Sequence, residues 1–280
     1  MPPRRGASLS SPLPAWSLPA TERESIDIAQ EWPERVTAEW AYGGSSGAGA
    51  SVCILDSGVD ASHPLVGTVE QSVAVVAEGD GFEVVPDEEG DLCGHGTACA
   101  GIVRQLAPEC SLHSVRVLGA GYTGSGDVLL VGLRWAIEQG FDVVNMSIST
   151  TKSKFASVLH ELADSAYFGR TILCASAHNL AVESYPWRFS SVISVGSHEE
   201  ADPRLLYANP TPPVEFFARG VDLDVAWPGG GTLRCTGNSF ATPHVAGLCA
   251  LALAKHPQLT PFQVKHLLYL TAENVRGGTR

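Results

Sequence analysis

Three short segments of the sequence contain residue types that could together carry out nucleophilic catalysis. The segment "LDSGVDASHP" contains Asp56, "GHGTACAG" contains His95, and "GNSFATPHVAG" contains Ser239. Serine is a poor nucleophile unless a histidine takes its proton, and a buried aspartate can fix the histidine tautomer and stabilise the imidazolium. A carboxylate, an imidazole and a hydroxyl that meet in space therefore predict acyl transfer through a covalent intermediate.

The segment that contains Ser239 has the features of a helix start. A helix that begins near Ser239 would direct its free N–H groups and the positive end of its dipole at the hydroxyl. A backbone N–H in that position can help to hold a developing oxyanion. Pro243 falls where the first helical N–H groups lack partners within the helix, so its missing N–H costs little.

These segments resemble the three catalytic blocks of subtilisin-like serine proteases, in the Asp, His, Ser order of that family. They read "ILDSGVDASHP", "GHGTACAGIV" and "GNSFATPHVAG", and "VRVLGAGYTGSG" and "SSVISVGS" between them also look like family segments. The resemblance extends over about residues 40–272. It implies that Asp56 orients His95, that His95 is the general acid and base, and that Ser239 is the nucleophile.

The resemblance also implies how the substrate is held. Asn179 matches the family's side-chain donor to the oxyanion. A peptide substrate would pair by strand addition with the backbone of Ser147, Ile148 and Ser149. Cys99 resembles a thiol found near the catalytic histidine in some relatives, where it either packs or offers a site for thiol-reactive inhibition.

The chain departs from the family around the primary specificity pocket. His178 replaces a glycine that lines this pocket, so we expect the pocket to be narrowed or reshaped. Glu183 and Ser184 fall where the family builds another part of it, and a carboxylate there could favour Lys or Arg in the substrate. The acidic stretch 87–91, just before His95, is either a solvated loop or a second element that recognises basic residues.

The catalytic segments require a scaffold that brings them to one place. Apolar runs predict strands over 50–58, 111–119, 141–149, 170–179, 189–198 and 213–220. Helices are predicted over 97–107, 124–140, 155–169, 237–257 and 260–272. This alternation predicts an α/β fold with a mostly parallel central sheet and helices on both faces, in three layers. Ligands bind beyond the carboxyl ends of such strands, where Asp56, Ser147 and Asn179 lie.

Composition limits the function classes. The chain has 280 residues and a net charge of −12, which argues against nucleic acid or a membrane surface as the main partner. Seven cysteines without a CxxC pair favour free thiols in a reducing compartment, and we expect a cytoplasmic protein. No cofactor or metal site is expected, and the short link "RQLAPEC" at 104–110 argues against an essential calcium site there.

One catalytic domain with an N-terminal extension is predicted. Residues 1–40 form an N-terminal extension, partly disordered because it is rich in Pro and Ser, and residues 41–280 form the catalytic domain. The extension is too short for a folded inhibitory prodomain, so we expect the enzyme to be active as made or controlled by a separate regulator or inhibitor.

The predicted function is that of a serine endopeptidase acting on a restricted peptide or precursor substrate. One alternative keeps the acyl-enzyme but passes the acyl group to an amine, as in a peptide cyclase or leader-processing protease of a peptide natural-product pathway. A second alternative, a non-enzymatic peptide-binding module, is disfavoured because Asp56, His95, Ser239 and Asn179 are all present.

Overall fold

The computed structural model describes residues 15, 17–18 and 31–275. Contacts divide the chain into two units, Met1–Glu34 and Arg35–Arg280. The few described residues of the first unit form no helix or strand, and the predicted extension 1–40 lies mostly outside the described residues. Every helix and strand described below belongs to the second unit.

Within residues 31–275, nine strands form one central sheet in the order β3-β2-β4-β1-β5-β6-β7-β9-β8. Neighbouring strands are parallel except for the edge pairs β2–β3 and β8–β9. The strands are β1 Ser51–Asp56, β2 Gln71–Glu78, β3 Gly81–Pro86, β4 Ser111–Arg116, β5 Val143–Met146, β6 Ile172–Ser176, β7 Ile193–His198, β8 Tyr207–Ala208 and β9 Phe216–Arg219. The predicted mostly parallel sheet is therefore confirmed.

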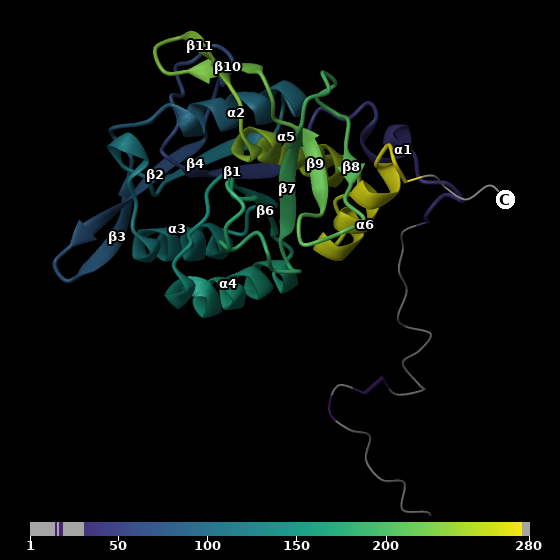
Figure 1. Ribbon diagram of the computed structural model, residues 1–280, viewed down its shortest axis with the longest axis horizontal. Coiled ribbons are helices and arrows are strands. Elements are labelled where there is room, and N and C mark those ends of the chain that lie inside the picture. Colours follow the sequence, from purple (N-terminus) through teal and green to yellow (C-terminus); the bar gives the residue numbers. More distant parts are fainter. Residues whose placement is uncertain (1–14, 16, 19–30, 276–280) are drawn as a thin grey trace, which may run out of the picture. The chain divides into compact units, whose positions relative to one another are not determined.

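Helices cover both faces of this sheet. Figure 1 shows α3 and α4 on one face, and α2 and α5 on the other. The helices are α1 Ala38–Tyr42, α2 His95–Leu106, α3 Gly126–Glu138, α4 Ala156–Phe168, α5 Asn238–Lys255 and α6 Pro261–Thr271, with short 3-10 turns η2 Ala120–Tyr122 and η3 Ser153–Phe155. No helix among the described residues is both long and apolar enough to cross a membrane.

The hydrophobic core lies between the sheet and its helices. The central strand β1 is buried from Val52 to Asp56, because both of its faces are covered. On the α3 and α4 side, Leu133 and Leu159 pack with Leu55 and Met146. Helix α5 is buried almost all round from Phe240 to Leu253, the pattern of a helix that passes through a core.

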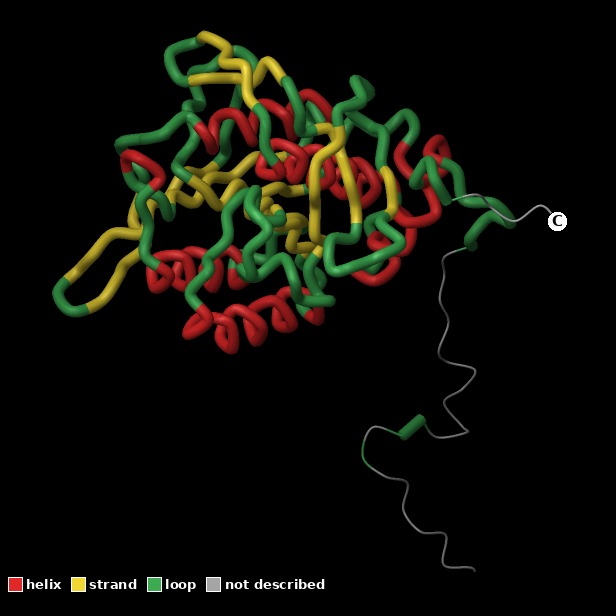
Figure 2. The backbone as a smooth tube through the Cα atoms, in the orientation of Figure 1, coloured by secondary structure: helices red, strands yellow, loops and turns green. Residues whose placement is uncertain are grey.

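Two antiparallel hairpins were not predicted from the sequence. One is β2–β3, which projects from the edge of the sheet in Figure 2. The other pairs β10 (Leu223–Trp227) with β11 (Gly231–Cys235) and packs on α2 through Ala98 and Val225. The turns "EGDG" at 78–81 and "PGGG" at 228–231 carried a hairpin signal. Such hairpins fall outside the strand–helix alternation that the prediction followed.

The topology brings the predicted catalytic segments to one edge of the sheet. Asp56 is the last residue of β1, and segments 147–149 and 177–179 directly follow β5 and β6. Strands β1, β5 and β6 are parallel neighbours, so their carboxyl ends lie together. His95 and Ser239 occupy the first turns of α2 and α5. Pro243 lies inside α5, past the first four N–H groups, so the prediction that it falls among the N–H groups without a helical partner is wrong.

The far end of α2 is fixed by one arginine. The Arg104 guanidinium donates hydrogen bonds to the carbonyl oxygens of Val66 (2.8 Å), Thr68 (2.8 Å), Pro108 (2.7 Å) and Cys110 (2.9 Å). These oxygens come from loops on both sides of the helix end, so one fixed cation joins them. That there is no essential calcium site in the link 104–110 stays a prediction, and a guanidinium lies among the carbonyl oxygens there.

Replacement of Arg104 tests how much its hydrogen bonds contribute to the stability of the fold. In Arg104→Met the apolar stem remains while four carbonyl oxygens lose a charged donor, so unfolding should require about 2–3 kcal/mol less. Thermal denaturation should then show Tm lower by roughly 5–10 °C. Arg104→Lys keeps the charge without the planar guanidinium, so its Tm should lie between those of the wild type and Arg104→Met. Equal Tm values for all three proteins would contradict this role.

Candidate active site

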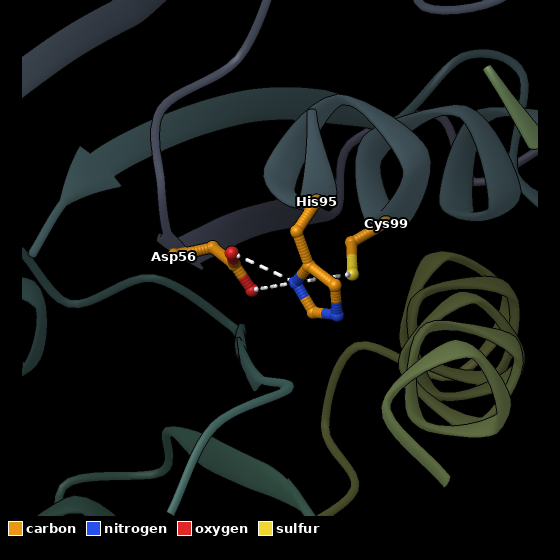
Figure 3. Close-up of side chains that lie close together, drawn as sticks. All are labelled: Asp56, His95 and Cys99. Atoms are coloured by element: carbon orange, nitrogen blue, oxygen red, sulfur yellow. Dashed lines mark hydrogen bonds and ion pairs between the residues drawn. The ribbon is translucent and has the colours of Figure 1, made fainter. Parts of the chain in front are cut away.

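The centre of the site is a buried pair formed by Asp56 and His95. Asp56 has no exposed surface, and His95 is 8% exposed. Both carboxylate oxygens of Asp56 lie 2.9 Å from Nδ1 of His95, as Figure 3 shows. A carboxylate only accepts hydrogen bonds, so Nδ1 must carry the proton. The other ring nitrogen, Nε2, is then left as the base.

The same pair sets the charge state of the imidazole. Burial alone would lower the pKa of His95, but the charge of Asp56 and its hydrogen bond outweigh this effect. The result is a pKa well above the usual value for histidine. An imidazole held in this way accepts a proton from a nucleophile more readily than a free one.

A second carboxylate, that of Asp91, holds the first turn of α2 against the end of β1. Its Oδ1 accepts hydrogen bonds from Ser57 Oγ (2.7 Å) and Gly94 N (2.8 Å), and its Oδ2 accepts one from Thr97 N (2.8 Å). Ser57, which follows Asp56, also accepts a hydrogen bond from Gly96 N (3.0 Å). The residue after Asp56 and the residues around His95 are thus one hydrogen-bonded unit.

Two glycines allow this close packing. Gly94 has a left-handed backbone (φ 88°), and a Cβ on it would lie 2.5 Å from the ring of Trp227. A Cβ on Gly96 would lie 2.0 Å from the carbonyl oxygen of Gly58. The sequence "GHG" therefore lets the helix start directly against two neighbouring segments.

The acidic stretch before His95 is engaged within the protein. Asp87 and Glu89 bind Arg116 at 3.0 and 2.7 Å, and Asp91 caps α2. These three carboxylates are committed to partners of their own chain. The hypothesis that this stretch recognises basic substrate residues therefore loses three of its four acidic groups, and Glu88 remains.

Most of the other predicted site residues line one cavity. It has a volume of about 260 Å³. Its walls include His95, Ser147, Ile148, Ser149, His178, Asn179 and Ser239. Leu118 and Tyr122, which the sequence did not single out, complete the wall beside His95. The exposed ring of Tyr122 meets the imidazole edge-on at a centroid distance of 6.0 Å.

Ser239 is fixed through its backbone. Its carbonyl oxygen accepts a hydrogen bond from Ser147 Oγ (2.7 Å), and Cys99 Sγ lies 3.8 Å from it. The same sulfur lies 4.0 Å from His95 Nδ1, so Cys99 Sγ contacts both the imidazole and the backbone of Ser239. Among the described residues no hydrogen bond joins the Ser239 hydroxyl to His95; such contacts often tighten only when substrate binds.

The Asn179 amide and the Ser239 hydroxyl border the same small space. Asn179 Oδ1 accepts a hydrogen bond from Asn238 N (2.9 Å). The position that a Cβ on Gly237 would take is 3.2 Å from Ser239 Oγ and 3.4 Å from Asn179 Nδ2. A nucleophile and an N–H donor that share one space can hold a carbonyl group during attack.

Two of the predicted specificity residues face elsewhere. Ser184 is fully buried, and its hydroxyl accepts a hydrogen bond from Trp187 Nε1 (2.7 Å). Glu183 binds Arg188 at 2.6 Å and accepts a hydrogen bond from Tyr185. Glu183 and Trp187 line a second cavity of about 450 Å³, whose lining includes neither Asn179 nor Ser239. Among the lining residues, Ala177 and His178 border both cavities.

The Asp56–His95 pair and Cys99 also form a set of donors suited to a soft cation. Within the described residues their ligand atoms lie within 4.8 Å of one another. Burial raises the pKa of the Cys99 thiol, so a cation would have to displace its proton. A metal ion bound there would take the carboxylate from His95, and so it would oppose the acid–base chemistry.

Comparison with known proteins agrees with this geometry. Residues 47–280 match the Subtilase family. Subtilisin E of Bacillus subtilis (strain 168) is 32% identical over 82% of this chain, which spans only 62% of that protein. Subtilisin DY of Bacillus licheniformis is 32% identical over 83% of this chain and 86% of its own. A cold-adapted subtilisin-like serine proteinase of known crystal structure superimposes with a TM-score of 0.65 at 27% identity, over 84% of this chain and 88% of that one. This protein therefore belongs to the subtilase family.

Proposed function

We propose that the protein is a serine endopeptidase that works through an acyl-enzyme. The observation that carries the proposal is the buried Asp56–His95 pair, whose imidazole lines the same cavity as Ser239 and Asn179. Each component of acyl transfer has a candidate residue: a nucleophile, a base oriented by a carboxylate, and a donor for the oxyanion.

The residues act in a fixed order. His95 Nε2 takes the proton of Ser239 as Oγ attacks the carbonyl carbon of the substrate. The oxygen of the tetrahedral intermediate takes the negative charge and is held by Asn179 Nδ2 and the Ser239 N–H. His95 gives its proton to the leaving amine, the C–N bond breaks, and the acyl-enzyme remains. Water, activated by the same imidazole, then attacks the ester and restores Ser239.

A peptide substrate would lie along the segment that follows β5. Among the described residues, the backbone groups of Ile148 and Ser149 make no hydrogen bond to another backbone segment. Just after this segment, an isolated antiparallel bridge joins Thr150 to Tyr185. An extended peptide could therefore add as a strand at 147–149, next to Ser239 in the same cavity.

We further propose that the enzyme accepts a restricted set of substrates. His178 lines the cavity, and its Nδ1 accepts a hydrogen bond from Leu180 N (3.0 Å). This bond orders the ring, and an ordered ring reduces the room for a large substrate side chain. The paired Glu183 offers no free carboxylate to attract Lys or Arg.

The state of the cysteines supports a proposal about the cellular compartment of the protein. All seven lie in the described part of the chain as free thiols, and five of them are buried. Such thiols persist in a reducing compartment, which favours a cytoplasmic enzyme. A separate regulator or inhibitor of its activity remains part of this proposal.

Active-site labelling tests the proposed nucleophile. A fluorophosphonate should label the wild-type protein and leave Ser239→Ala unlabelled, and peptide cleavage should fall by about 10⁶-fold in that variant. Ser190→Ala, which changes an exposed serine, should label normally. A folded wild-type protein without label would contradict the proposal. Cleavage products that lack the mass of one water would show transfer of the acyl group to an amine.

The pH dependence of kcat/KM tests the role of Asp56. His95 must be neutral to act as the base, so the rate should rise with pH through its elevated pKa. In Asp56→Asn the carboxylate that raises this pKa is gone and burial lowers it, so the acid limb should move to lower pH while kcat falls about 10⁴-fold. Asp164→Asn, from the exposed His160–Asp164 pair, should leave the profile unchanged. An acid limb that stays in place in Asp56→Asn would exclude this role.

Substrate profiling tests the restriction by His178. Removal of the ring in His178→Ala opens the wall of the cavity, so peptides with a large apolar residue before the cleaved bond should gain about 10-fold or more in kcat/KM relative to small ones. Val182→Ala, which lines only the second cavity, serves as the control. Identical profiles for wild type and His178→Ala would show that another group limits the substrate.

A further inference from the structure

Strands β6 and β7 separate beside the active site. They are paired up to Ser176 and Val195, and Ala177 N still donates to the Val195 carbonyl oxygen. Beyond this point β7 continues to His198, whereas residues 177–179 turn towards the cavity that holds Ser239. The segment that carries the proposed oxyanion donor, Asn179, is thus no longer held by the sheet.

The side chain of Asn238 fills the gap between the two strands. Its Oδ1 accepts hydrogen bonds from Ser197 N (3.0 Å) and Ser197 Oγ (2.9 Å) on β7. Its Nδ2 donates to the carbonyl oxygens of Ala177 (3.2 Å) and His178 (3.4 Å). The side-chain amide therefore takes the place of a missing peptide group between β7 and the departing segment.

These contacts need a side chain with an acceptor at one end and two donor hydrogens at the other. The partners on β7 are an N–H and a hydroxyl, and the partners on the departing segment are carbonyl oxygens that only accept. A carboxamide meets both requirements at once. A carboxylate would set a second acceptor against two carbonyl oxygens, and an alanine would leave all four groups without this partner.

The backbone of Asn238 holds the donor itself. Its N–H donates to Asn179 Oδ1 at 2.9 Å, which fixes the rotation of that amide. The Nδ2 atom of Asn179 is then the free end, and it lies near the space that Ser239 Oγ borders. One residue, directly before the nucleophile, thus contacts both the segment and the side chain of Asn179.

Packing alone does not hold the segment. The cavity of about 450 Å³, which Ser239 does not line, borders Ala177 and His178, and Asn238 also lines it. Open space there gives the segment room to move by an ångström or more once its hydrogen bonds are lost. Displacement on this scale is enough to lower a catalytic rate on the order of 10²-fold.

We propose that Asn238 is a positioning residue that fixes Asn179 for its work as the oxyanion donor. The inference rests on the proposed endopeptidase function and adds a residue that touches neither substrate nor the reacting atoms. Oxyanion stabilisation acts in the transition state, so its loss lowers kcat and leaves KM nearly unchanged.

The test is a double-mutant cycle with a peptide substrate, normalised to active sites counted by fluorophosphonate labelling. Asn179→Ala should lower kcat about 10²–10³-fold. Asn238→Ala should lower kcat about 10–100-fold, with KM within about 3-fold of wild type. If Asn238 acts through Asn179, adding Asn238→Ala to Asn179→Ala should lower kcat by less than about 3-fold further.

Two further variants separate positioning from folding. Asn238→Asp keeps the size and both hydrogen bonds from Ser197, so it should fold even where Asn238→Ala is unstable, and its kcat should also fall. Asn274 holds Ala208 N (2.8 Å) and Ala208 O (2.7 Å) in a similar way at the far edge of the sheet. Asn274→Ala should therefore lower Tm and leave kcat unchanged.

The outcomes are distinct. The inference is supported if Asn238→Asp lowers kcat in the wild-type protein but does not lower it further in a protein that already carries Asn179→Ala. Wild-type kcat in Asn238→Asp, or losses that multiply in full in the double mutant, would overturn it while leaving the endopeptidase intact. A wild-type protein that neither labels nor cleaves peptides would reject the proposed function, and the inference with it.

Discussion

The burial of one carboxylate is the constraint on which the rest of the site depends. Asp56 lies at the end of a central strand with no exposed surface, so its charge must be compensated within the protein. His95 Nδ1 and the N–H of Ser57, at 2.8 Å, provide the compensation. The imidazole is thereby fixed in one tautomer, and its other nitrogen is left to accept a proton. A buried charge thus becomes an oriented base.

Fixing that base requires two helices to begin at the same place. Helix α2 presents His95 in its first turn, and Asp91 ties this turn to Ser57. Helix α5 presents Ser239 in its first turn, held through Ser147 from the end of β5. Hydrogen bonds from strand ends to helix starts therefore set the distances between groups that lie far apart in the chain. The helices themselves are placed by the packing of their apolar residues on the sheet.

The sequence predicted the parallel sheet and the residues around the cavity, because both leave local signals. Asp56, His95 and Ser239 stand in short segments rich in glycine, at boundaries of apolar runs. The pairing of Ser184 with Trp187, and the turning of Glu183 towards Arg188, depend on a loop conformation that local patterns do not encode. The role of Asn238 could not be predicted in this way, because its hydrogen bonds with Ser197, 41 positions earlier, exist only in the folded chain. The contacts of Asp91 with Ser57 and with the start of α2 could not be predicted either, because in the sequence it is one of several acidic residues in a loop.

The guanidinium of Arg104 among four carbonyl oxygens has a consequence for how the enzyme relates to its surroundings. A free ion at such a position would leave whenever its concentration fell, and the loops would loosen. A cation that is part of the polymer cannot be diluted or chelated. The guanidinium therefore joins these loops without needing an ion from the medium.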